Sequence, residues 1–379
     1  MENPTMVFLR RALSAALALA FAGVVSAQAT MRPPVTPFGP KPLGQSKIAF
    51  VGNQAVPPYG SQRDIFVINP DGTGLVNLTH DALTDLRPTW SPDGTKIAFI
   101  TLDGGNCYLR VVNADGTGLR RVMNDHVEYT APIAWSPDSR ALAYVAALSL
   151  HLCRINVDGM QKTELTHFKV GGMDWGANNK LVFNKTEVGE GWMQLYSLNP
   201  DGTGLTLLSR GFRKVQPLWS PNGQKLAYEE LVPNMPTGNV VLSKPNGAEP
   251  NSVGGGWHAA WSRDGRKVAF IESLGNTVAV SVDGGMGFRI PTTGLSDSPS
   301  FSPDGQSIAY GNRDGGPNNG QLMVIPASGG TARPILPKGI SLARETVAPG
   351  YPCPRYIAWC PVASFPLIRT TLPGTGGAL

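Results

Sequence analysis

The chain has 379 residues, of which 45 are Gly and 33 are Pro, and 41% of its residues are hydrophobic. So many turn formers, combined with enough apolar residues for a large core, predict a globular protein and exclude a disordered one. The formal net charge at pH 7 is only +5, and the sequence has no Lys/Arg run or aromatic-basic stripe. These features argue against a nucleic-acid-binding protein. We therefore attribute the pI of about 9.0 to charged side chains on a solvated surface.

The N-terminal stretch MVFLRRALSAALALAFAGVVSAQA is typical of a secretory signal. It combines two arginines, an apolar run of about fifteen residues, and the small residues Val25 and Ala27 before Gln28. The run is too short to favour a permanent membrane span, although an uncleaved anchor and a twin-arginine signal are alternatives. We therefore interpret residues 1–27 as a cleaved signal peptide and predict a periplasmic or secreted protein that does not span the membrane after cleavage.

We expect the exported protein to begin at or near Gln28, because signal peptidase cleaves after small residues in this arrangement. N-terminal sequencing of the exported protein measures this directly. A mature chain that retains Leu19 would contradict the interpretation.

The stretch PTWSPDGTKIAF, residues 88–99, predicts a β-hairpin. Proline at the second turn position presets φ, Asp93 tolerates the third position, and Gly94 supplies the positive φ that the turn requires. Two further short strands follow, YLRVV and LRRVM, which the Gly-rich turn NADGTG joins. The unit is therefore expected to be a sheet of four antiparallel strands.

The same turn recurs in the stretches AWSPDSRALAY, LWSPNGQKLAY, AWSRDGRKVAF and SFSPDGQSIAY, and in the degenerate DWGANNKLVF. The aromatic residues before these turns are 40 to 45 residues apart: Trp90, Trp135, Trp175, Trp219, Trp261 and Phe301. This period is that of one β-propeller blade, and neighbouring blades cover the faces that a single sheet leaves exposed. We interpret the tryptophans, Trp359 included, as packing residues between blades and not as a sugar-binding set.

The two ends of the repeat region complement each other. Residues 47–80 hold the last three strands of a blade, whereas RYIAWCP, residues 355–361, supplies only the missing first strand. If these strands pair, the ring closes at seven blades and leaves no open sheet edge between the termini. The expected organisation is a signal peptide (1–27), a Pro-rich tether (28–46), an all-β propeller (47–361) and a C-terminal tail (362–379), in a chain that we expect to be monomeric.

The motif WSPDG-x-KIAF followed by VVNADGTGLRRV resembles the TolB-type propeller repeat, which is also found in the propellers of prolyl-oligopeptidase-like enzymes. The resemblance covers most of residues 47–361 and implies a β-propeller. For TolB itself it implies six blades after a separate α/β domain, whereas here only residues 28–46 lie between the signal and the first strand. Six blades is thus the alternative to seven, and membership of the Tol-Pal envelope system is an open question at this point.

Catalytic and metal motifs are scarce in the chain. The G-x-S-x-G elbow of the prolyl-oligopeptidase-like enzymes does not occur, and no histidine pair has H-x-H or H-E-x-x-H spacing. His80, His126 and His167 each follow the last strand of a blade, so a weak metal constellation on one rim is an alternative. The NPDGTG loops lack the distal Glu of an EF-hand and are interpreted as turns. We predict no catalytic residue, no metal and no cofactor.

Export permits disulfides, so the question is which of the four cysteines lie close enough to pair. Cys353 and Cys360 would lie roughly 20 Å apart along a strand, beyond the disulfide limit of about 7 Å. Cys360 also stands where other copies have the turn serine, which makes it a serine substitute. Cys107 and Cys153 fall on facing sides of adjacent blades, which leaves a bridge between them open.

The predicted ring has two unlike faces. The SPDG and DGTG turns lie on one face, and the dissimilar loops NQAVPPYGSQR, KTEVGEGW, EELVPNMPTG and NRDGGPNNG lie on the other. Long, dissimilar loops on a rigid scaffold are the usual location of recognition, although tolerated insertions are the alternative.

The predicted binding site consists of the residues that enter the innermost strands at the channel mouth, with two neighbouring tryptophans. They are Asp85, Glu128, Lys169, Trp192, Arg213, Trp257, His258, Asp297 and Arg355. Mixed charges beside aromatic rings suit a peptide or protein segment. We predict a non-catalytic, exported scaffold that binds a protein or peptide partner in the cell envelope.

The alternative is a propeller enzyme, such as a polysaccharide lyase or glycosidase, that acts at the channel mouth. A cluster of three histidine or carboxylate side chains within metal-binding reach would favour it.

Overall fold

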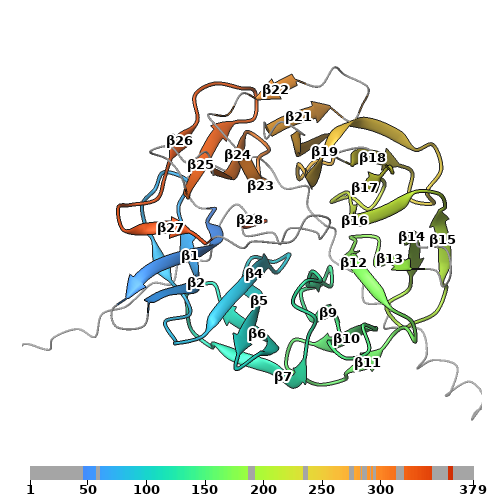
Figure 1. The fold of residues 1–379 in the computed structure, drawn as a ribbon, viewed down its shortest axis with the longest axis horizontal. Coiled ribbons are helices and arrows are strands. Elements are labelled where there is room, and N and C mark those ends of the chain that lie inside the picture. The colour runs from blue at the N-terminus through green and yellow to red at the C-terminus, as the bar shows by residue number, and fades with distance from the viewer. Residues whose placement is uncertain are drawn as a thin grey trace, which may run out of the picture. The chain divides into compact units, whose positions relative to one another are not determined.

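The computed structural model describes residues 46–56, 60–186, 193–233, 238–272, 277–281, 283, 288–290, 292, 296–312, 320–343 and 357–361. All of them belong to one compact unit, Lys41–Leu379. Every regular element among them is a β-strand, and the sheets surround a central axis (Figure 1). None of the described residues forms a helix that could cross a membrane. The predicted all-β propeller with four-stranded blades is confirmed.

The strands follow one another along the chain with short connections. The first half comprises β1 (Ile48–Val56), β2 (Gly60–Ile68), β3 (Val76–Asn77), β4 (Thr84–Trp90), β5 (Lys96–Asp103), β6 (Asn106–Asn113), β7 (Arg120–His126), β8 (Ala134–Trp135), β9 (Ala141–Val145), β10 (Leu152–Asn156), β11 (Thr163–Glu164), β12 (Val170–Trp175), β13 (Leu181–Thr186) and β14 (Met193–Leu198). The second half comprises β15 (Thr206–Ser209), β16 (Arg213–Trp219), β17 (Leu226–Leu231), β18 (Asn239–Ser243), β19 (Asn251–Trp261), β20 (Lys267–Glu272), β21 (Thr277–Ser281), β22 (Phe288–Ile290), β23 (Ser296–Phe301), β24 (Ser307–Asn312), β25 (Gln321–Pro326), β26 (Arg333–Pro334), β27 (Ile340–Leu342) and β28 (Ile357–Trp359).

Hydrogen bonding groups these strands into six sheets. Four have four strands each, in the orders β4-β5-β6-β7, β11-β10-β9-β8, β12-β13-β14-β15 and β23-β24-β25-β26. The fifth sheet joins β1, β2 and β3 to β27 and β28, and the sixth contains the seven strands from β16 to β22. The structure therefore has six blades, and the prediction of seven is wrong.

The seven-stranded sheet arises because β19 belongs to two successive repeats. Its first residues pair with β18 and its last residues pair with β20, so two four-stranded units share this eleven-residue strand. Glycines permit this path: Gly254 has φ +153°, and a Cβ on Gly256 would lie 2.2 Å from the carbonyl oxygen of Ile271.

The SPDG turns close as the sequence predicts. The Ser91 hydroxyl donates to Asp93 Oδ1 at 2.6 Å, and the Gly94 amide donates to the Ser91 carbonyl at 2.8 Å. Gly94 has φ +70°, the left-handed conformation that glycine adopts without strain. The same serine-to-turn bond recurs at Ser136, Ser220, Ser262 and Ser302.

The DGTG loops are turns that use their own aspartates. Asp71, Asp115 and Asp201 each accept a hydrogen bond from the hydroxyl and one from the amide of the threonine two residues on. These bonds hold the pKa of all three carboxyls below the ordinary value of 3.8. The carboxylate oxygens already serve the turn, in agreement with the turn interpretation.

The tryptophans pack between neighbouring sheets, as predicted. Five of them are only 5% to 7% exposed: Trp90, Trp135, Trp175, Trp219 and Trp359. The Trp135 indole also donates to the carbonyl of Thr89 on the preceding innermost strand, at 3.1 Å. These rings therefore fill the space between neighbouring sheets, and the Trp135 indole also bonds to the sheet before it.

The last described strand, β28, lies in the sheet of β1. β28 pairs with β1 through Ile48↔Trp359 and Phe50↔Ile357. The Trp90 indole donates to the Ala358 carbonyl at 3.1 Å, the same bond that Trp135 makes one sheet further on. β28 thus takes the innermost position before β4.

Cys360, directly after β28, is the counterpart of the turn serine. The Cys360 amide donates to the Lys47 carbonyl at 2.8 Å, as the Ser91 amide donates to the Lys96 carbonyl. Cys360 therefore occupies the serine position, as predicted. β27 was not predicted, and it pairs with β1 beyond β28 through Gly52↔Leu342.

Candidate functional site: the loop face of the ring

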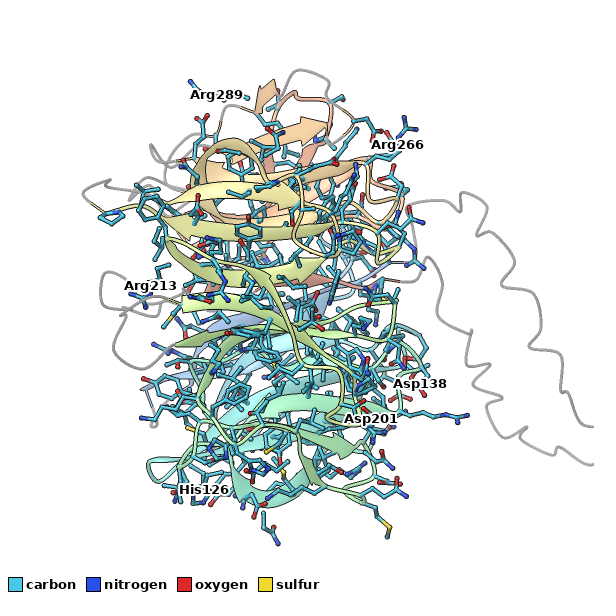
Figure 2. All side chains as sticks on the ribbon, turned by 90° about the vertical axis from the view of Figure 1, so that its right-hand side faces the viewer. His126, Asp138, Asp201, Arg213, Arg266 and Arg289 are labelled. Carbon is cyan, nitrogen blue, oxygen red and sulfur yellow. The ribbon has the colours of Figure 1, made fainter. Side chains whose placement is uncertain are left out.

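The two faces of the ring differ as the sequence predicts. In Figure 2, the turn residues Asp138, Asp201 and Arg266 lie on the right-hand face, whereas His126 and Arg213 lie on the opposite face. We call the face that carries His126 and Arg213 the loop face. Of the four long loops that the sequence predicts for this face, residues 57–59, 187–192, 234–237 and 313–319 fall outside the described part of the chain. Trp192 and Arg355 also lie outside it.

A recurrent β-bulge shapes the innermost strands. In β4, β12, β16, β19 and β23 the register shifts by one residue a few positions before the aromatic residue. Four polar residues stand at this bulge with positive φ: Arg87, Gln216, His258 and Ser298. Such a conformation costs about 1–3 kcal/mol in a non-glycine residue, and bulges often re-aim side chains beside functional sites.

Two predicted residues come together at this position. His258 Nδ1 lies 3.2 Å from Asp297 Oδ1, and both side chains are less than 10% exposed. The His258 amide also donates to Glu229 Oε1 at 2.6 Å, and Glu229 is itself buried. His258 thus connects to Glu229 through its backbone amide and to Asp297 through its imidazole, which links three successive repeats.

Asp85, on β4, is buried and is not part of the group of Glu229, His258 and Asp297. Its side chain is fully buried, accepts a hydrogen bond from the Thr101 hydroxyl at 2.5 Å, and lies 3.9 Å from Arg110 Nη1. Arg110 is committed to Asp81 at 2.7 Å. Burial therefore prevails over the Thr101 bond and the Arg110 charge, and raises the pKa of Asp85 to about 7.

The other predicted residues remain separate. Glu128 caps its own loop by accepting bonds from the Thr130 amide and hydroxyl. Lys169 is exposed, whereas Trp257 and Arg213 are half-buried, with Arg213 Nε 3.4 Å from the sulfur of Met193. The structure thus pairs His258 with Asp297 and leaves the rest of the set distributed around the ring.

Sequence reasoning missed three exposed apolar side chains in connections on the loop face. Tyr129 lies between β7 and β8, Leu148 between β9 and β10, and Phe212 between β15 and β16. Their exposed fractions are 42%, 96% and 42%. The sequence feature that could have identified them is an aromatic residue or a leucine in a connection between strands, outside the repeat pattern.

Sequence reasoning also missed a second group of residues, at the outer strands β10 and β11. His151, Glu164 and His167 place their ligand atoms within 4.8 Å of one another. The sequence had grouped His167 with His80 and His126, because all three follow a last strand. The structure instead brings His167 to the start of β10. Because β10 and β11 are outer strands, this cluster does not support a catalytic site at the channel mouth.

The cysteines that the structure describes are free thiols: Cys107, Cys153 and Cys360. The bridge left open between Cys107 and Cys153 is thus not formed, and Cys353 lies outside the described residues. Burial raises the pKa of the Cys107 and Cys153 thiols, which disfavours reactive thiolates.

Comparison with known proteins agrees with this architecture. No protein-family model matches the chain. The TolB homologue of Chlorobaculum tepidum is 31% identical over 138 residues, which are 35% of this chain and 29% of that protein. The chain spans between 14% and 29% of the length of the first three curated relatives that it matches.

Solved structures show the same fold. TolB from Acinetobacter baumannii aligns with a TM-score of 0.51 at 17% identity, over 83% of this chain and 66% of that one. An oligogalacturonate lyase in complex with manganese aligns with a TM-score of 0.54 at 15% identity, over 67% and 81%. The repeats and the ring define a β-propeller with two unlike faces. The similarity to TolB homologues and to the TolB structure supports a TolB-type propeller.

Proposed function

We propose that the chain is an exported, non-catalytic propeller that binds a protein or peptide segment of the cell envelope on its loop face. The observation that carries the proposal is the asymmetry between a face of near-identical turns and a face whose connections differ in sequence from one repeat to the next. Similarity to TolB homologues supports the envelope location. The pairing of β1 with β28 supports a scaffold that is closed between its ends.

Two cationic side chains of the predicted set can contact an acidic group of the partner. Asp85 and Asp297 are buried and engaged inside the ring, and Glu128 caps its own loop. Lys169 is exposed and Arg213 half-buried, and neither forms an ion pair with another described residue. Lys169 and Arg213 thus offer cationic groups to a partner, and Phe212, next to Arg213 in the chain, provides exposed apolar area.

We expect Arg213→Ala to weaken partner binding roughly thirtyfold, since anchor residues of this type often contribute about 2 kcal/mol. Trp257→Ala is expected to act in the same direction. A pull-down from envelope extract supplies the partner, and the affinity of each variant for it is then measured alongside its melting temperature.

Arg266→Ala is the matched control, because Arg266 is an exposed arginine on the turn face. It is expected to leave the affinity unchanged. If Arg266→Ala abolished binding while Arg213→Ala and Trp257→Ala bound normally, the site would lie on the turn face and the proposal would fail.

An enzyme at the channel mouth is the second candidate, because the pair of His258 and Asp297 offers an imidazole and a carboxylate there. Incubation with oligogalacturonate and Mn²⁺, followed by ultraviolet absorbance of unsaturated products, separates the two functions. We expect no product. Product formation that His258→Ala removes would establish the enzyme.

A further inference from the structure

The group of His151, Glu164 and His167 is held by the surrounding backbone. His151 precedes β10, Glu164 ends β11, and His167 lies in the connection to β12. Cys153 pairs with Glu164 across the two strands, which fixes the register between them. The Thr166 hydroxyl accepts from the Leu152 amide and donates to the Phe168 carbonyl, so the segment that carries His167 is tied to β10.

Both imidazoles converge on one carboxylate oxygen. His151 Nδ1 lies 2.6 Å and His167 Nδ1 lies 3.1 Å from Glu164 Oε1, and the two rings meet edge to face with centroids 6.2 Å apart. The side chains are 23%, 43% and 87% exposed for His151, Glu164 and His167. An ion can therefore reach the group from solvent.

These distances suit a small transition-metal ion. Tetrahedral Zn²⁺ with ligands at about 2.0–2.1 Å separates its ligand atoms by roughly 3.3 Å, so from Glu164 Oε1 the His151 nitrogen needs to move by about 0.7 Å and the His167 nitrogen by about 0.2 Å. Two imidazole nitrogens and one carboxylate oxygen form a typical Zn²⁺ set, whereas Mg²⁺ and Ca²⁺ take oxygen ligands.

We propose that His151, Glu164 and His167 form a Zn²⁺ site at the rim of the loop face, with the fourth position open to water. The ion would join the β9–β10 connection, β11 and the β11–β12 connection. This site is independent of partner binding at the channel mouth, because it lies on the outer strands of one repeat (Figure 1).

The test uses the full chain, stripped with a chelator, and a Zn²⁺ titration against a chromophoric competitor. Wild-type protein is expected to bind Zn²⁺, whereas His167→Ala and Glu164→Gln are each expected to lower the affinity at least tenfold. Mg²⁺ and Ca²⁺ are expected not to compete. His167 is mostly exposed, so its replacement should leave the metal-free melting temperature unchanged.

His126→Ala is the matched control, because His126 is an exposed histidine on the same face that contacts Tyr108 instead. It is expected to bind Zn²⁺ as the wild type does. Equal affinity in His167→Ala and His126→Ala, or no Zn²⁺ binding by the wild type, would overturn the proposal.

Discussion

A chain that lacks residues 355–379 is expected to melt at least about 10 °C below the full chain, or to lose cooperative unfolding altogether. The deletion removes β28, in which Ile357 and Trp359 are 3% and 6% exposed. It also leaves Ile48–Phe50 of β1 without their partner strand and removes the contact of β28 with β4. Truncating a buried tryptophan alone costs about 3–5 kcal/mol, a large share of a typical stability of about 5–15 kcal/mol.

A point substitution in β28 tests the contribution of this strand without shortening the chain. Trp359→Ala should remove the indole bond to the Ser46 hydroxyl and lower the melting temperature by roughly 5–10 °C. Deleting only residues 362–379 keeps β28 and is expected to have no effect. Equal melting temperatures for the two truncations, measured by differential scanning calorimetry, would show that β28 does not hold the ends together.

The repeat made most of the fold predictable from the sequence. The turn residues and the aromatic before each turn are local signals, so the hairpins, the packing of Trp135 and the serine role of Cys360 followed from their positions. The shared strand β19 did not follow. Its run of glycines gives no periodic signal, and the sheet continues only because Gly256 has no Cβ to meet Ile271.

The candidate site was less predictable because it depends on contacts between repeats. The sequence placed His258 and Asp297 at the mouth but carried no information on the 3.2 Å distance between them. A bulge after Trp257 also breaks the two-residue alternation of the strand, so the spacing of Trp257 and Trp261 in the sequence does not tell whether they share a face of the sheet. Similarly, His151 and His167 are sixteen positions apart in sequence and meet only when β11 folds onto β10.

The Asp85→Asn variant is expected to gain stability relative to the wild type as the pH rises from 4 to 8. Burial raises the pKa of Asp85 from 3.8 to about 7, so the folded state keeps a proton that the unfolded state releases within this range. Wild-type stability from this group is thus fully present below pH 4 and is lost as the pH approaches 7 and beyond. At about 1.4 kcal/mol per pKa unit, the difference between variant and wild type should change by roughly 4 kcal/mol.

Urea unfolding of both proteins at several pH values from 4 to 8 measures this difference. Other groups cancel in the comparison, since Asp81 keeps its bond to Arg110 in the variant. Asp115→Asn is the control without a slope: turn bonds lower the pKa of Asp115 below 3.8, so its carboxylate stabilises the fold throughout pH 4 to 8, and the difference between this variant and the wild type is expected to stay constant over that range. A gap between Asp85→Asn and wild type that stays constant from pH 4 to 8 would mean that Asp85 is already ionised in the folded ring, with Arg110 and Thr101 compensating for its burial.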